Sequence, residues 1–287
     1  MSDATTSRPV TIRPDEAAHF GRLAAEWWDP NGSSAMLHRL NPVRLAFLRE
    51  AIDRHWSFTP DDRRPLTGLS ALDVGCGAGL LCEPLARLGA EVTGVDAAPE
   101  NIAAAASHAE GAGFTTPLPF RGGAGGGAEL EKPAPIDKPH PPAPSPEGEG
   151  EKAGTIRYLA GDLTTLDLGT FDLVTAMEVI EHVADKSAFV RALTQSAAPG
   201  GLLVISTPNR TAASALLLSG AAEWAGAIPR GTHRWGDFIT PGELEELLTE
   251  AGFTVTRRSG IAFSPARGLH LSDNMALNYI LSARRPG

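Results

Sequence analysis

The sequence contains only two cysteines, Cys76 and Cys82, and they lie within one short segment. This excludes a disulfide framework and a CxxC metal pair, so we expect a reducing cytoplasm as the compartment. Positive charge is also scarce, because the formal net charge is −9. Such a surface is not built to neutralise phosphates, which argues against nucleic acid as a principal partner.

Long apolar runs are absent as well. No uninterrupted apolar run reaches the roughly 18 residues that a membrane-spanning helix needs. The first residues, MSDATTSRPVTIRPDEAAHF, contain no apolar core of secretory length. We therefore expect a cytoplasmic protein that is soluble or peripheral at the inner face of the cell membrane.

The first 66 residues show helical periodicity. Apolar residues recur at helical spacing from Asp15 to Trp28, and this predicts an amphipathic helix that ends in the pair Trp27 and Trp28. A second helix is predicted from Pro42 to His55. We interpret residues 1–66 as a helical cover on the domain that follows.

Residues 67–287 alternate short apolar runs with helical stretches, which is typical of a parallel sheet in a doubly wound, Rossmann-like α/β domain. The predicted strands are LSALDV, EVTGVD, TIRYLAGD, FDLVTAM, GLLVISTP, FTVTRRSG and MALNYILSA. One segment interrupts the pattern. Residues 111–154 are rich in Gly, Pro and Glu, which predicts a disordered loop inserted outside the domain. The alternative is a proline-rich docking tail for a partner.

The run LDVGCGAG at residues 72–79 predicts a ligand site. A strand that leads through glycines into a helix places this loop at the carboxyl edge of the sheet, where such folds bind nucleotide-like ligands. Gly75, Gly77 and Gly79 remove side chains that would separate backbone and ligand, or they merely form a tight turn. Their spacing differs from the dinucleotide fingerprint. Asp73 would repel a pyrophosphate and attract a cation, which favours S-adenosylmethionine.

Two further acids follow predicted strands. Asp96 ends GVD, where a carboxylate accepts hydrogen bonds from ribose hydroxyls in nucleotide-binding sheets, and Asp162 in AGD is in position to reach an adenine amino group. Cys76 lies inside the glycine loop without a basic neighbour in sequence, so we interpret it as a small filler rather than a nucleophile.

Several stretches resemble one methyltransferase family. WWDPNGSSAMLHRLNPVRLAFL, AMEVIEHV, STPNR, PRGTHRWGDFITPGEL and DNMALNYIL are similar to the ubiquinone-biosynthesis O-methyltransferases, which are class I S-adenosylmethionine-dependent enzymes. The resemblance covers nearly the whole chain except residues 111–154. It implies a seven-stranded, mostly parallel sheet whose last strand is antiparallel. It also implies a polyprenylated catechol or quinol substrate and a ubiquinone-synthesis complex as a partner.

The resemblance also carries site residues over to this chain. Arg44, Gly75, Asp96 and Met177 match the family's cofactor-binding positions. An arginine at position 44 is suited to pair with the cofactor's carboxylate, and Met177 to lie against its adenine or sulfonium. The alternatives are a solvated charge for Arg44 and ordinary core packing for Met177.

Glu178, Glu181 and His182 in MEVIEHV form a candidate catalytic cluster. If this turn is helical, the three side chains share one face and could bind Mg²⁺, which would orient a catechol and lower its hydroxyl pKa. His182 could instead act as a general base without metal, or the acids could cap the helix. All three interpretations are compatible with the spacing.

Two later segments are candidates for substrate handling. His233 and Trp235 form either a lid over the substrate ring or a surface turn. Residues 212–228 are apolar and flanked by Arg210 and Arg230, which suggests docking on a membrane surface, with a helix buried against the domain or a dimer partner as the alternative. Functional alternatives are a methyltransferase for another small acceptor or a silent cofactor-binding subunit.

Overall fold

A computed structural model describes residues 12, 14–32, 34–114, 154–211, 214 and 235–287. The helices are α1 (Pro14–Arg22), η1 (Ala24–Glu26), α2 (Ala35–Trp56), α3 (Cys82–Arg87), α4 (Pro99–Gly111), η2 (Ile180–His182), α5 (Lys186–Gln195), η4 (Trp235–Asp237) and α8 (Pro241–Glu250). The strands are β1 (Ser70–Val74), β2 (Glu91–Asp96), β3 (Ile156–Ala160), β4 (Phe171–Met177), β5 (Ala197–Pro208), β6 (Thr254–Ser264), β7 (Gly268–Ser272) and β8 (Asn278–Arg284). The predicted insertion, residues 111–154, lies outside the described residues except at its two ends.

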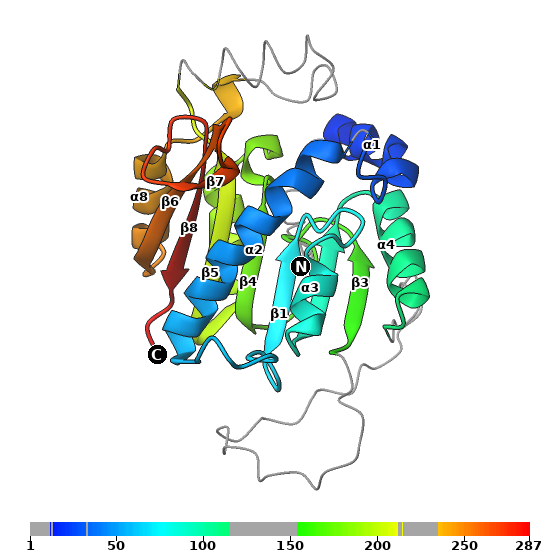
Figure 1. Ribbon diagram of the computed structural model, residues 1–287, viewed down its shortest axis with the longest axis horizontal. Helices are drawn as coiled ribbons and strands as arrows, with labels where there is room; N and C mark the ends of the chain where they lie inside the picture. Colours follow the sequence, from blue (N-terminus) through cyan, green and yellow to red (C-terminus); the bar gives the residue numbers. More distant parts are fainter. Residues whose placement is uncertain (1–11, 13, 33, 115–153, 212–213, 215–234) are drawn as a thin grey trace, which may run out of the picture.

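The strands form one sheet in the order β3-β2-β1-β4-β5-β8-β6-β7 (Figure 1). The first five pair in parallel, while β8 pairs antiparallel with both β5 and β6. This confirms the Rossmann-like, mostly parallel sheet with an antiparallel last strand. The described sheet has eight strands rather than seven. Strand β7 was missed because GLHLS is short and pairs only with the end of β6, which extends past the predicted FTVTRRSG.

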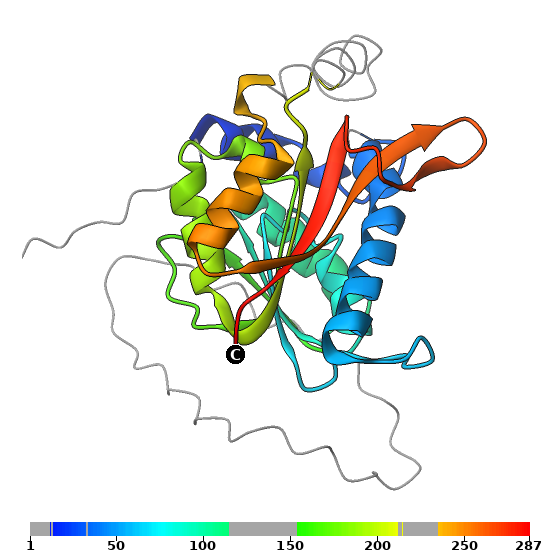
Figure 2. The same cartoon turned by 90° about the vertical axis from the view of Figure 1, so that its left-hand side faces the viewer.

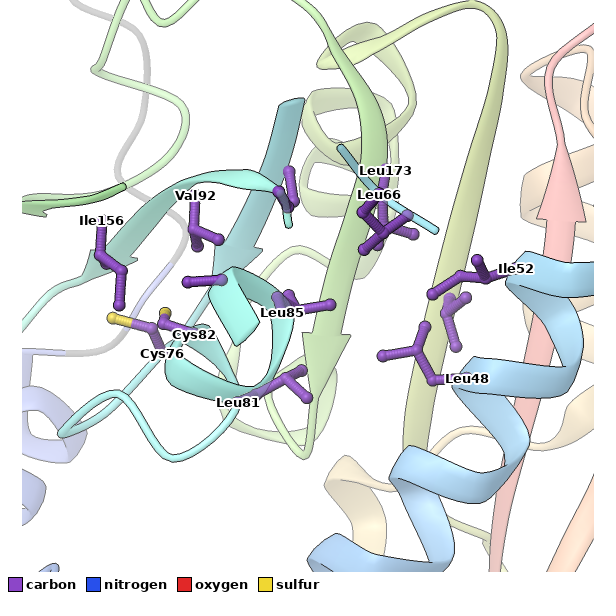
Figure 3. Packing of buried hydrophobic residues seen from close by; sticks show 14 of the residues in the cluster. Leu48, Ile52, Leu66, Cys76, Leu81, Cys82, Leu85, Val92, Ile156 and Leu173 are labelled. Carbon is purple, nitrogen blue, oxygen red and sulfur yellow. The ribbon is translucent and has the colours of Figure 1, made fainter. Parts of the chain in front are cut away.

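Helices cover both faces of the sheet. Helices α2, α3 and α4 lie on one face, and α5 and α8 lie on the other (Figures 1 and 2). On the first face, Leu48 and Ile52 of α2 point toward the same apolar cluster as Leu85 and Leu173 (Figure 3). The predicted cover therefore contributes to the core of the sheet domain.

Helix α2 begins seven residues before the predicted start, at Ala35 rather than Pro42. Proline is most favourable in the first turn of a helix, but Pro42 lies inside α2. In the structure, buried Leu40 and a hydrogen bond from Asn41 Nδ2 to the Leu80 carbonyl (2.9 Å) anchor the preceding turn. Tertiary contacts therefore extend the helix through its proline.

Candidate active site

The carboxyl ends of the parallel strands meet at one edge of the sheet, and the glycine loop lies there after β1 (Figure 1). The backbone N–H groups of Gly75 and Cys76 donate to the Val95 carbonyl at 2.7 and 3.0 Å, which fixes the loop against β2. Gly75, Gly77 and Gly79 all have positive φ, at 68°, 54° and 87°. This left-handed backbone disfavours any residue with a Cβ.

Each glycine also gives space to another part of the protein. A Cβ at Gly75 would collide with Val179, one at Gly77 with the Trp27 ring, and one at Gly79 with the Tyr158 hydroxyl. The sequence interpretation assigned the missing side chains to a close ligand. The structure shows that they also let Val179, Trp27 and Tyr158 pack directly on the loop, and the close approach of a ligand stays a prediction.

Asp73 lies beneath this loop and is almost completely buried. Thr175 Oγ1 donates to its Oδ1 at 2.7 Å, and the Cys82 thiol lies 3.4 Å from Oδ2. Burial raises the Asp73 pKa to about 6, against the lowering effect of these hydrogen bonds. Desolvation likewise raises the pKa of Cys76 to about 11, which agrees with a filler rather than a nucleophile.

Asp96 connects the end of β2 to the glycine loop. Its Oδ2 accepts from the Gly77 N–H at 2.9 Å, and its Oδ1 accepts from the Ala98 N–H (2.9 Å) and Asn101 Nδ2 (3.1 Å). Burial raises its pKa despite these donors. The structure thus places Asp96 beside the predicted cofactor loop, and its contact with a ribose stays a prediction.

Asp162 is held by its own turn and by the N-terminal segment. Its Oδ1 accepts from the backbone N–H and the hydroxyl of Thr164, at 2.8 and 2.6 Å, and its Oδ2 accepts from the Ile12 N–H at 2.9 Å. Sequence spacing did not suggest these partners. The expected contact of Asp162 with an adenine amino group stays a prediction.

Arg44 is buried rather than solvated, with a relative exposure of 4%. Its Nη2 lies 3.0 Å from Glu178 Oε1, yet neither Nε nor Nη2 has a well-aligned hydrogen-bond acceptor within the described ranges. A buried guanidinium with unused donors is costly unless an anion completes its shell. The unused N–H donors of Arg44 could therefore bind a carboxylate, and the predicted cofactor carries one.

Glu178 is the point at which four segments meet. Its backbone φ is 56°, an uncommon conformation for a non-glycine residue. Oε1 accepts from Ser206 Oγ and Oε2 from Asn278 Nδ2, both at 2.8 Å, in addition to the Arg44 ion pair. Sequence reasoning missed Ser206 and Asn278. They lie in the quoted motifs STPNR and DNMALNYIL, but no spacing rule connects residues 28 and 100 positions away from Glu178.

Glu181 has a separate set of contacts. Its Oε2 accepts from Thr207 Oγ1 at 3.0 Å, and its Oε1 lies 4.0 Å from His182 Nε2. Burial, and then repulsion from Glu178, raises the Glu181 pKa to about 7. The ring of Phe20 from α1 meets the His182 imidazole edge-on, with centroids 5.0 Å apart.

The expectation that Glu178, Glu181 and His182 share one helical face is wrong. Helix η2 begins at Ile180, so Glu178 precedes it. Glu178 bonds to Ser206 and Glu181 to Thr207, and successive residues of a strand point to opposite faces of the sheet. In the part of the chain that the structure describes, no three His, Cys, Asp or Glu side chains are grouped to hold a metal ion. The predicted Mg²⁺ site therefore has no preformed ligand set there.

The other predicted positions are described in part. Met177 ends β4 and packs partly buried against the cluster under α2. His233, Arg230 and residues 212–228, apart from residue 214, lie outside the described residues, and Trp235 begins η4. Among the described helices, none has the length and apolar character needed to cross a bilayer.

Comparison with known proteins gives a consistent result. Residues 36–258 match the family described as a methyltransferase domain. The chain is 42% identical over 275 residues to a ubiquinone biosynthesis O-methyltransferase of Azorhizobium caulinodans, which covers 95% of this chain and 93% of the relative. It is 40% identical to the protein of the same name from Methylobacterium nodulans, with 96% of both chains covered.

Solved structures share the fold at much lower identity. The magnesium protoporphyrin IX methyltransferase of Synechocystis PCC 6803 has been solved with S-adenosylmethionine and with S-adenosylhomocysteine bound. The two structures superpose with TM-scores of 0.54 and 0.52 at 17% and 18% identity. They cover 95% and 92% of this chain, and 98% of their own chains. At this identity they support the fold alone.

Gly77→Ala is expected to destabilise the protein more than Gly68→Ala. Both glycines have positive φ, so each alanine variant loses about 1 kcal/mol from backbone strain. Only the alanine at 77 would also collide with Trp27, because space beside Gly68 is open among the described residues. Overpacking adds about 1 to 3 kcal/mol. Urea unfolding of both variants measures this, and equal losses would contradict the packing of Trp27 on the loop.

Glu181→Gln is expected to stabilise the protein increasingly as the pH rises. The pKa of about 7 in the folded protein lies above the ordinary value of 4.5 for a glutamate, so the wild type loses stability as the pH rises from about 4.5 to 7. Glutamine cannot ionise and avoids that loss, on the order of 2 kcal/mol. Unfolding free energies at pH 5 and pH 8 test this. A variant-to-wild-type difference that is the same at both pH values would refute the burial of an ionisable Glu181.

Proposed function

The chain belongs to the family of ubiquinone biosynthesis O-methyltransferases, and we propose that it methylates a phenolic hydroxyl of a polyprenylated ubiquinone precursor with S-adenosylmethionine as the methyl donor. The acceptor would be a catechol or a quinol. Similarity over nearly the full length of chain and relatives supports this assignment. The described residues supply groups suited to the cofactor.

The observation that carries the proposal is the buried Arg44 guanidinium beside the glycine loop. Its Nε and Nη2 have no well-aligned hydrogen-bond acceptor among the described residues, although Nη2 pairs with Glu178 and the side chain is almost fully removed from water. A carboxylate is the acceptor that best satisfies a guanidinium, because the two groups match as a fork. S-adenosylmethionine carries such a carboxylate, together with an ammonium and two ribose hydroxyls for Asp73 and Asp96.

The roles of the residues follow from this placement. S-adenosylmethionine supplies a methyl group that its sulfonium has already activated. Arg44 would hold the carboxylate end, and Asp96 would hold the ribose after releasing the Gly77 N–H. Asp73 acts from below the loop, where its charge favours a cationic ligand. The protein therefore positions the methyl donor and the acceptor and excludes water, and it forms no covalent bond with either.

A proton must leave the acceptor hydroxyl as its oxygen bonds to the methyl carbon and the carbon–sulfur bond breaks. His182 is the proposed general base, because imidazole accepts protons near neutral pH. Its Nε2 faces Glu181 Oε1 at 4.0 Å, so a carboxylate is near to stabilise the imidazolium. The described acids have no preformed ligand set for a metal ion, so the proton transfer is assigned to His182 alone.

Transfer from labelled S-adenosylmethionine to a short-tailed, reduced demethylubiquinone analogue is the direct test. We expect turnover by the wild type and a kcat about a hundredfold or more lower for His182→Asn, because general-base catalysis contributes factors of this size. Parallel reactions with Mg²⁺ and with EDTA decide between the base and the metal hypotheses. Turnover that collapses with EDTA would move the proposal to a metal site.

The matched control is His270→Asn, which changes a partly buried histidine of β7 that bonds only locally to the Gly268 carbonyl. It should leave turnover unchanged. Cofactor binding without any transfer to the analogue would contradict the substrate assignment. It would favour another small acceptor or the silent-subunit alternative.

The apolar segment 212–228 remains our proposed membrane contact. A polyprenylated substrate partitions into the bilayer, so an enzyme that acts on it gains access by docking on that surface. Arg230, at the far end of the segment, is proposed to meet anionic head groups, whereas Arg210 at the near end already pairs with Glu243. A ubiquinone-synthesis complex as partner stays a prediction from the family.

Vesicle flotation tests this contact. We expect the full chain to float with vesicles that contain anionic lipid and to float less after Leu216→Glu and Leu217→Glu together. A chain that stays at the bottom of the gradient with both anionic and neutral vesicles would exclude the membrane role of 212–228. Phe263→Glu is the matched control, because it adds charge at an exposed phenylalanine elsewhere.

A further inference from the structure

Trp27 packs directly on the glycine loop. It follows η1 and is 9% exposed. The edge of its six-membered ring occupies the space beside Gly77, where a Cβ would collide with Cη2, Cζ3 and Cζ2. A residue of the predicted cover is therefore in contact with the loop that we assign to the cofactor.

The indole N–H of Trp27 is buried and has no acceptor among the described residues. An indole nitrogen is only a donor, so it cannot be satisfied by another donor. Leaving such a group without a partner costs roughly 1 to 3 kcal/mol. Buried donors are nearly always paired, which makes this one a candidate for a ligand contact.

The position of Trp27 is fixed by its neighbours. Its carbonyl accepts a hydrogen bond from His38 Nε2 of α2 at 2.7 Å. The adjacent Trp28 donates Nε1–H to the Ala78 carbonyl of the loop at 3.0 Å, and it stacks on His108 of α4 with ring centroids 3.4 Å apart. These contacts hold the Trp27 ring in place against the loop.

Arg44 also has buried donors without a well-aligned acceptor, and the Tyr158 hydroxyl that packs on Gly79 is a third such group. The charge of Arg44 acts on Asp73, which precedes the glycines at the end of β1. The donors of Trp27 and Arg44 would be satisfied by a ligand group that accepts hydrogen bonds. In S-adenosylmethionine the ammonium, the ribose hydroxyls and the adenine amino group donate, and the carboxylate is the one anionic acceptor.

We propose that Trp27 is a cofactor-binding residue that donates its indole N–H to the carboxylate of S-adenosylmethionine, together with Arg44. The inference rests on the proposed function. It adds a contact from the N-terminal cover, so docking of the cover and cofactor binding favour each other. Trp28 fastens the cover to the loop and makes no cofactor contact.

The test compares two ligands in the full-length protein by calorimetry. S-adenosylhomocysteine carries the carboxylate, and its decarboxylated form lacks only that group. Trp27→Phe should weaken S-adenosylhomocysteine about tenfold, as expected for a lost hydrogen bond to a charged group, and change the decarboxylated ligand less than twofold. Unchanged affinity for S-adenosylhomocysteine, or an equal loss for both ligands, would overturn the proposal.

Two controls separate this inference from other failures. Trp28→Phe should lower the melting temperature and weaken both ligands equally, because it loses the bond to Ala78 and part of the stack on His108 but leaves the Trp27 indole unchanged. If Trp27→Phe does not fold, the Trp27 indole can be replaced by the isosteric benzothiophene ring, which has sulfur in place of N–H. The same selective loss is expected, and its absence would again refute the contact. A wild type that binds neither ligand would refute the proposed function itself.

Discussion

The buried ion pair between Arg44 and Glu178 is the interaction on which the site depends. It joins α2 to the end of β4, and Ser206 and Asn278 attach the same carboxylate to β5 and β8. Buried pairs contribute little net stability, but losing one partner leaves an uncompensated charge at a cost of about 3 to 5 kcal/mol. Glu178 also has a left-handed backbone, a conformation that costs of order 1 to 3 kcal/mol. The pair is therefore better explained by the geometry it imposes than by stability.

That geometry unites the N-terminal helices with the sheet. Arg44 lies on the buried face of α2, whose Phe47, Leu48 and Ile52 belong to the core cluster beside β1 and β2. Trp27 and Trp28 then hold the preceding turn on the glycine loop. The cover is consequently a wall of the site, and its position is set by the same buried contacts that stabilise the fold.

Local patterns predicted most of the fold, and non-local contacts account for what they missed. Seven strands could be predicted from apolar runs, because a strand that is buried in the sheet needs apolar side chains along its own length. They did not locate β7, which exists only as the partner of β6, or the first turns of α2, which are anchored at Leu80. For the candidate site, the motifs and the family resemblance selected Arg44, Asp73, Asp96 and Glu178, whose roles stay predictions. Their hydrogen-bond partners Thr175, Ser206 and Asn278 are distant in sequence, so no local pattern connects them. The ion pair between Arg44 and Glu178 likewise joins two residues far apart in the sequence.

The arrangement of Glu178 and Glu181 after β4 differs from the predicted shared face, and it explains how the two acids coexist there. Ser206 and Thr207 are neighbours in β5 and direct their hydroxyls to opposite faces, so they separate the carboxylates of Glu178 and Glu181. Arg44 neutralises Glu178, while burial raises the Glu181 pKa to about 7 and reduces its charge near neutral pH. Repulsion between the acids is thus relieved without a metal between them. This separation is consistent with the proposed roles, in which Glu178 with Arg44 belongs to the cofactor side and Glu181 with His182 to the proton of the acceptor.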